Sequence, residues 1–78
     1  MTNAFVLVTT EIDAMEKVLH ALREIDDVTE AYSLYGAYDV IARINAQDAS
    51  TLKEIVFRRI RRLSGVRNTV TLTTIEKI

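Results

Sequence analysis

Seventy-eight residues make one small domain, with 49% hydrophobic residues and a net charge of −1 that argues against a protein built mainly to hold nucleic acid. The absence of cysteine excludes disulfides, and His20 as the only imidazole argues against a metal site, so no cofactor is expected. No apolar run approaches the roughly 20 residues of a membrane helix. The amino terminus also lacks a signal-peptide pattern, which predicts a cytoplasmic protein without a membrane partner.

The first half of the chain predicts a strand and then a helix. Residues 4–9 are rich in valine and phenylalanine, which favour a pleated surface. Apolar residues then recur at helical intervals between Met15 and Ile25, and this pattern predicts an amphipathic helix. Asp13 and Glu16 have the spacing of a capping box, so we expect Asp13 to cap that helix.

A glycine turn follows between two further strands. Residues 28–35 predict the second strand, and residues 38–46 predict the third, in which mostly apolar side chains occupy every second position. Gly36 supplies the backbone freedom for a tight turn between them. Tyr38 and Asp39 are thereby held beside a turn at one end of a sheet. Such a place suits either a strand cap or the rim of a small-molecule site.

The second half of the chain predicts a second helix and a last strand. Asp48 is placed to cap a helix that ends at Ser64-Gly65, and the β-branched residues 66–75 predict the last strand. A faint repeat of thirty-eight residues supports this order, because Leu22, Ile25 and Val28 recur as Ile60, Leu63 and Val66. Two such units predict an α+β, ferredoxin-like βαββαβ sandwich, in which a four-stranded antiparallel sheet carries two helices on one face.

The face of the sheet that the helices leave uncovered is expected to be apolar. It would carry side chains from the first three strands, namely Phe5, Leu7, Tyr32, Leu34 and Ile41. An apolar face of this kind usually marks an interaction site, and a domain of this size buries only about 60% of its unfolded surface. We therefore predict a homo-oligomer in which these residues form a dimer interface.

Three motifs in this order of elements resemble the effector domain of the Lrp/AsnC transcription regulators, also called the RAM domain. They are Gly36-Ala37-Tyr38-Asp39 before an apolar strand, Asp48 with Leu52, and the run Gly65-Val66-Arg67-Asn68-Thr69-Val70-Thr71. The resemblance covers almost the whole chain. Full-length members carry an N-terminal helix-turn-helix domain that binds DNA, whereas here the effector fold begins within the first few residues. We expect residues 1–78 to form one RAM domain without a helix-turn-helix domain.

The resemblance also implies an assembly and a ligand site. In the family, dimers form by facing sheets and associate into rings such as octamers, and amino acids bind in clefts between dimers. Carried onto this chain, the site comprises Tyr35, Gly36, Ala37, Tyr38, Asp39, Thr69 and Thr71. Asp39 would pair with the ammonium of the ligand, and the threonines would hydrogen-bond its carboxylate or backbone atoms. Many relatives have Val-Thr-Gly where this chain has Leu34-Tyr35-Gly36, so the bulkier tyrosine changes the size of the pocket.

Simpler interpretations stay open for several of these residues. Asp39 is equally well explained as a strand-start residue that bonds to turn amides. His20 lies off the apolar stripe of the first helix and is expected to be solvated. The arginines between Arg58 and Arg62 lie on the outward side of the second helix, where such runs are usually solvated or bridge subunits. Direct DNA binding is therefore not expected.

The function expected from the sequence is an oligomeric amino-acid-sensing module and not an enzyme. It would modulate transcription of amino acid metabolism indirectly, by associating with full-length Lrp/AsnC regulators or by buffering the effector. Two alternatives stay open. One is a small cofactor-free ferredoxin-like enzyme in which a buried His20 or Asp39 acts as base, and the other is a purely structural oligomerisation module.

Overall fold

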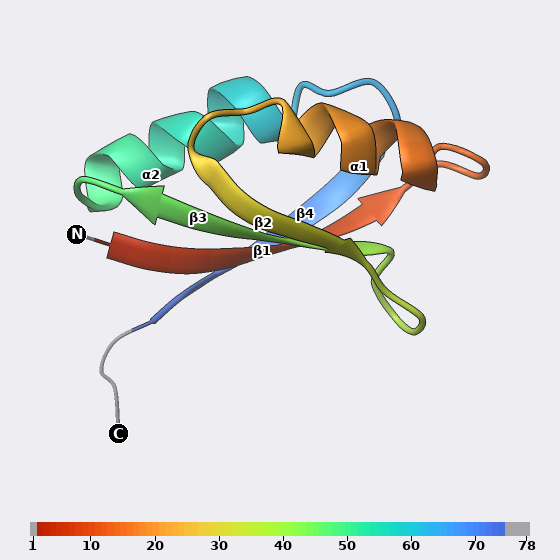
Figure 1. The fold of residues 1–78 in the computed structure, drawn as a ribbon, viewed down its shortest axis with the longest axis horizontal. Helices are drawn as coiled ribbons and strands as arrows, with labels where there is room; N and C mark the ends of the chain where they lie inside the picture. Colours follow the sequence, from red (N-terminus) through yellow and green to blue (C-terminus); the bar gives the residue numbers. More distant parts are fainter. Residues whose placement is uncertain (1, 75–78) are drawn as a thin grey trace.

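Four strands and two helical segments alternate in the predicted order. A computed structural model describes residues 2–74 of the chain. The elements are β1 (Thr2–Thr10), α1 (Met15–Arg23), β2 (Val28–Ser33), β3 (Val40–Ala46), α2 (Ala49–Ile55), the π-helical turn η1 (Val56–Ile60) and β4 (Val66–Thr73). The strands pair antiparallel in the order β2-β3-β1-β4, and the helices cover one face of the sheet (Figure 1). This arrangement confirms the ferredoxin-like α+β fold.

The core lies between the helices and the two central strands. Alternate residues of β1 and β3 are buried on the helix side, as the period of two in the sequence predicted. They pack with apolar residues of the helical segments in one cluster, whose fully buried larger members are Val6, Val8, Val18, Leu22, Val40, Ile44 and Ile60. Burial of each such side chain contributes about 1.5 to 3 kcal/mol, so this layer fixes the register of the sheet.

The sequence repeat has a backbone counterpart. At the end of the first helix, the N–H of Ile25 donates to the oxygen of Leu22 at 3.1 Å, and at the end of the second, the N–H of Leu63 donates to the oxygen of Ile60 at 3.1 Å. The next hydrogen bond in each unit is also matched: Val28 donates to Ile25, and Val66 donates to Leu63. Both units therefore leave their helix and enter their strand by the same turn.

The capping box predicted for the first helix is wrong. Asp13 has a φ of 65°, and the residue that caps α1 is Ala14, which makes no side-chain capping hydrogen bond. The chain needs a left-handed residue to turn from β1 into the helix, and aspartate tolerates that conformation. This turn is held by two backbone hydrogen bonds instead, from Ala14 to the oxygen of Glu11 at 3.0 Å and from Glu11 to the oxygen of Gly65 at 2.7 Å.

The second helix begins as predicted but ends differently. The Asp48 carboxylate accepts a hydrogen bond from the backbone N–H of Thr51 at 2.7 Å, which confirms the predicted cap. After Ile55 the backbone widens into η1, where the N–H of Arg61 donates to the oxygen of Val56 at 2.9 Å, five residues back. The sequence predicted a regular helix through this segment.

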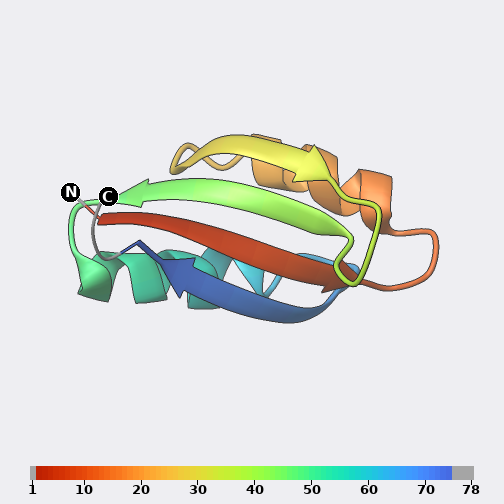
Figure 2. The same ribbon diagram turned by 90° about the horizontal axis from the view of Figure 1, so that it is seen from below.

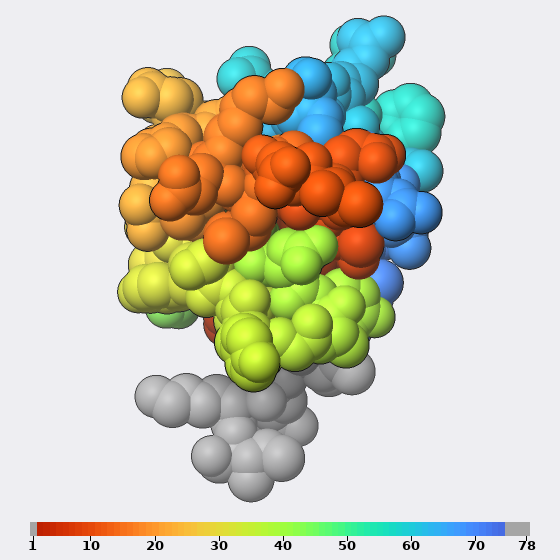
Figure 3. Space-filling model, turned by 90° about the vertical axis from the view of Figure 1, so that its right-hand side faces the viewer, coloured from red at the N-terminus to blue at the C-terminus, as the bar shows by residue number. Residues whose placement is uncertain are grey.

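The connection between β2 and β3 is longer than the predicted tight turn. Strand β2 ends at Ser33 and β3 begins at Val40, so residues 34–39 form a loop. The N–H of Leu34 donates to the oxygen of Asp39 at 2.8 Å and closes that loop. Figure 1 shows the loop, in yellow-green, projecting beyond the ends of β2 and β3, and Figure 3 shows it at the surface of the molecule.

Candidate functional site

Asp39 is anchored to the end of β1. Its backbone N–H donates to the oxygen of Val8 at 2.9 Å. Its carboxylate oxygen Oδ2 accepts from the backbone N–H of Thr10 at 2.8 Å and from the Thr10 hydroxyl at 3.3 Å. The other carboxylate oxygen makes no hydrogen bond to the described residues 2–74, and a carboxylate has room for further donors. Asp39 thus acts as a strand cap and still offers negative charge to the surroundings.

The rest of the 34–39 loop is open to solvent. Tyr35 is completely exposed, Gly36 and Ala37 are exposed, and Tyr38 is half-buried. An added Cβ at Gly36 would meet no atom within 4 Å. The loop therefore offers backbone amides and one free tyrosine to a partner or ligand from outside the chain.

The two predicted threonines lie on the other side of β1. Val8 of β1 pairs with Val40 of β3 on one side and with Thr69 of β4 on the other. Two strand spacings, roughly 10 Å, thus separate Thr69 from the start of β3. Thr71 lies one pair further along, opposite Val6. The structure places the loop and Thr69 at the same end of the sheet, with β1 between them.

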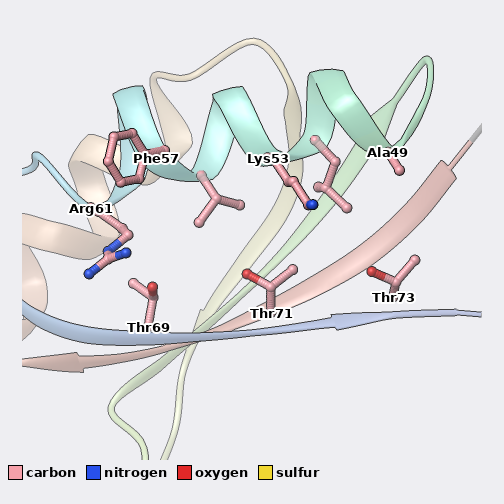
Figure 4. Close-up of a pocket in the computed structure, with 9 residues that line it drawn as sticks. Ala49, Lys53, Phe57, Arg61, Thr69, Thr71 and Thr73 are labelled. Atoms are coloured by element: carbon pink, nitrogen blue, oxygen red, sulfur yellow. The ribbon is translucent and has the colours of Figure 1, made fainter.

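Thr69 and Thr71 instead line a groove between β4 and the second helix. This β4 groove has a volume of about 530 Å³, and its walls are Ala49, Leu52, Lys53, Val56, Phe57, Arg61, Thr69, Thr71 and Thr73. Figure 4 shows the three threonines rising from the strand toward the helix. Sequence reasoning missed the helix wall: Lys53 and Phe57, four residues apart, share one helix stripe, but the position of Arg61 depends on η1.

The sheet face without helices is apolar, as predicted. Figure 2 views the molecule from this side. Phe5, Leu7, Tyr32 and Ile41 lie on it, and the register of β4 adds Val70 opposite Leu7 and Leu72 opposite Phe5. We call these six residues the outer sheet face. Leu34, the remaining predicted interface residue, lies just past the end of β2 and is 38% exposed.

A polar cluster borders the outer sheet face. The Tyr32 hydroxyl donates to Glu30 at 2.6 Å, and Arg43 forms an ion pair with Glu30 at 3.2 Å. The hydrogen bond from Tyr32, followed by that from Arg43, holds the pKa of Glu30 below its ordinary value, and the same carboxylate raises the pKa of Tyr32. With Phe5 and Ile41 these side chains line a hollow of about 200 Å³.

The remaining sequence candidates are solvated. His20 is exposed on α1, as predicted, and Arg58 forms an exposed ion pair with Glu54 at 3.4 Å. Within residues 2–74, no three His, Cys, Asp or Glu side chains come together in a way that would hold a metal ion. In the same part of the chain, no helix has both the length and the apolar character to cross a membrane.

Comparisons with known proteins all identify relatives of one family. The profile of the Lrp/AsnC ligand binding domain matches residues 3–78. An uncharacterized HTH-type transcriptional regulator of Pyrococcus furiosus, PF0250, is 29% identical over 76 residues, a match that covers 94% of this chain and 51% of the relative. The chain therefore spans about half the length of that curated relative.

Solved structures share the whole fold. TTHA0845 from Thermus thermophilus is 32% identical with a TM-score of 0.95, and the match covers 100% of this chain and 98% of that one. The transcriptional regulator NMB0573 from Neisseria meningitidis, solved as a complex with L-Met, is 20% identical with a TM-score of 0.89. That match covers 99% of this chain and 51% of the regulator, and at this identity it shows a shared fold.

Proposed function

The chain belongs to the family of Lrp/AsnC ligand-binding domains, and from this premise we propose that it is an oligomeric amino-acid-sensing module that modulates transcription indirectly. The observation that carries the proposal is the match of residues 3–78 to a ligand-binding domain together with the shared fold. The complex of NMB0573 with L-Met supports an amino acid as the class of effector. Curated relatives are named transcriptional regulators, which supports a regulatory role and not a catalytic one.

In this proposal the amino acid bridges two chains. One chain supplies the 34–39 loop, where Asp39 Oδ1 pairs with the ammonium of the ligand and the exposed backbone amides donate hydrogen bonds to its carboxylate. Another chain supplies Thr69 and Thr71. The physical reason is distance, because β1 separates the two groups within one chain. A ligand bound in this way favours the assembly that forms its site, by its differential affinity for that assembly.

The oligomer in this proposal is built on the outer sheet face. Six apolar or aromatic residues lie on it, and two of them, Tyr32 and Leu72, are more than half exposed. A contiguous apolar face of this kind marks an interaction surface. Facing sheets would form the dimer, dimers would associate into a ring, and full-length regulators of the same family are proposed as further partners. We also propose that residues 1–78 do not bind duplex DNA by themselves.

A purely structural oligomerisation module is the second candidate. The hydrogen bonds from Thr10 to Asp39 favour it, since they give the carboxylate a role that needs no ligand. The enzymatic alternative requires a buried base, and the exposure of His20 removes one of its two candidates.

A thermal-shift series with the twenty amino acids on the oligomeric protein tests the proposal. A ligand that binds only the native state raises the unfolding temperature in proportion to the logarithm of its concentration once it is in excess. At least one amino acid is expected to do so, and the shift is expected to be larger for the oligomer than for a dissociated variant. If none of the twenty shifts the transition of the intact oligomer, the structural module replaces the sensing one.

A further inference from the structure

We propose that the β4 groove is a second ligand site, which takes a small carboxylic acid with an apolar body and no ammonium group, such as a branched-chain 2-oxo acid. The groove lies within one chain and does not need the 34–39 loop. Its volume of about 530 Å³ falls within the range of small-molecule sites, about 300 to 1,000 Å³.

Two cations on the helix wall are directed toward the strand. Figure 4 shows Arg61 above Thr69 and the Lys53 amine directed toward the strand between Thr71 and Thr73. Within residues 2–74, neither cation forms an ion pair or donates a side-chain hydrogen bond to an oxygen. Arg61 only lies over the ring of Phe57, at 5.7 Å from the ring centre. Both cations are thus available to an anion in the groove.

The strand wall supplies neutral donors. Thr69, Thr71 and Thr73 stand at alternate positions of β4, so their side chains share the face that looks toward the helix. None of the three hydroxyls has a hydrogen-bond partner in the described part of the chain. A β-branched side chain has few rotamers, so these hydroxyls are well placed for a carboxylate and for a neighbouring keto oxygen.

The floor and the rim of the groove are apolar. Leu52 and Val56 are buried at its base, and Phe57 at its rim is 66% exposed. These residues can pack against the aliphatic or aromatic part of a ligand. The lining contains no aspartate or glutamate, so the ammonium of an amino acid would lose water there without gaining a counter-charge. The groove therefore favours an acid that lacks the amino group.

The π turn places Arg61 on this wall. In a regular α-helix, a side chain four residues further on is rotated by about 40° around the axis. Lys53 and Arg61 are eight residues apart, so a regular helix would carry Arg61 away from β4. The wider turn at η1 offsets part of that rotation. Turns of this kind are rare in proteins overall but are enriched at functional sites. Here η1 contributes Val56 and Phe57 to the groove, and Arg61 follows directly after it.

The two sites would bind chemically related molecules. A 2-oxo acid and its amino acid differ at C2, which carries a keto oxygen in one and an amino group in the other. Exchange of these groups with a second pair of 2-oxo acid and amino acid is the reaction class that interconverts them. An amino acid at the 34–39 loop and a 2-oxo acid in the β4 groove would report opposite sides of that reaction. The two proposed sites share Thr69 and Thr71, so an amino acid bridging to the loop of another chain and a 2-oxo acid in the groove would compete for these hydroxyls. They differ in their charged residues, which are Asp39 for the amino acid and Lys53 with Arg61 for the 2-oxo acid.

A matched pair of ligands tests the groove. The full chain is titrated with 4-methyl-2-oxopentanoate and, separately, with leucine, which has the same carbon skeleton, and binding is followed by calorimetry and by the NMR signals of Phe57 and Thr73. The 2-oxo acid is expected to shift both signals and to bind Arg61→Gln at least about tenfold more weakly, the scale of one charge-assisted hydrogen bond. Arg62→Gln is the control, because Arg62 is exposed on the same helix end but does not line the groove.

Several outcomes would overturn the groove proposal. It fails if the 2-oxo acid does not bind at millimolar concentration, if it binds Arg61→Gln as tightly as Arg62→Gln, or if leucine binds Asp39→Asn as tightly as the 2-oxo acid does. Asp39→Asn separates the two sites, since it should leave 2-oxo acid binding unchanged. Loss of 2-oxo acid binding in Asp39→Asn would also overturn the proposal, whereas absence of all amino acid binding would overturn only the proposed sensing function.

Discussion

The carboxylate of Asp39 holds the last residue of β1, Thr10, by two hydrogen bonds, at 2.8 Å to its backbone N–H and at 3.3 Å to its hydroxyl. Thr10 is the buried polar residue of the described chain, at 8% exposure. Its N–H would lack this acceptor without Asp39. One side chain therefore closes the 34–39 loop onto the sheet and also carries the negative charge of the proposed amino acid site.

Asp39→Asn separates these two roles. The asparagine oxygen can still accept from Thr10, so we expect the unfolding temperature to change little, whereas amino acid affinity should fall by about 10- to 100-fold because the partner of the ammonium is lost. Asp39→Ala should lower both, with a loss of about 1 to 3 kcal/mol in the free energy of unfolding from the unsatisfied N–H. Calorimetry and urea unfolding measure the two effects. Equal amino acid affinity in wild type and Asp39→Asn would leave Asp39 with a structural role only.

The fold was predictable because its signals are local and repeated. The period-two pattern of β1 and β3, the cap at Asp48 and the thirty-eight-residue repeat all agree with one architecture, and agreement across levels indicates a well-specified fold. The capping box at Asp13 failed because the same residue type also favours the left-handed turn that the chain requires there. Sequence spacing alone does not separate those two uses.

The candidate site was only partly predictable. Asp39 and the threonines could be named as candidates from the sequence and stay predictions, whereas the helix wall of the β4 groove was not foreseen. Its position depends on the π turn between Val56 and Arg61, and no residue type in that segment identifies such a turn. The distance between the loop and Thr69 depends on strand order, with β1 between β3 and β4. That order follows from the packing of the whole sheet.

Gly65 and Gly36 should differ sharply in their tolerance of a side chain. A Cβ at Gly65 would lie 2.8 Å from the Cβ of Ala14 and 3.2 Å from a methyl of Val18, and its φ is 97°. Gly65→Ala should therefore cost about 2 to 4 kcal/mol in the free energy of unfolding, from overpacking and backbone strain together. Gly36→Ala has open space and should cost about 1 kcal/mol from its backbone conformation alone. Urea unfolding of both variants measures the difference, and equal costs would contradict this account of the α1 turn.

The Asp48 cap should give stability that depends on acid pH. The backbone hydrogen bond from Thr51 holds the pKa of Asp48 below its ordinary value. A lowered pKa means that the contribution is present above the unfolded value, about 3.9, and is lost as the pH falls through the lower folded value. At pH 7, Asp48→Ala should lower the unfolding temperature by a few degrees, and this difference should shrink below about pH 4. Asp48→Asn, which keeps an acceptor, is the control, and a difference that stays constant from neutral pH down to about pH 2.5, below the ordinary range of an aspartate, would contradict the assignment.

The outer sheet face should control self-association. Leu7 and Ile41 lie directly opposite each other on β1 and β3 at its centre. Leu7→Lys with Ile41→Glu places an ion pair there, which limits repulsion within the chain but forces charges into any apolar contact between chains. We expect this variant to sediment as a monomer at micromolar concentration with an unchanged far-UV CD spectrum. The control is Ile12→Lys, because Ile12 is 89% exposed in the turn after β1 and lies outside the sheet. If the double variant keeps the oligomer of the wild type, the chains do not associate through this face, and the contact must be sought at the helices or the loop.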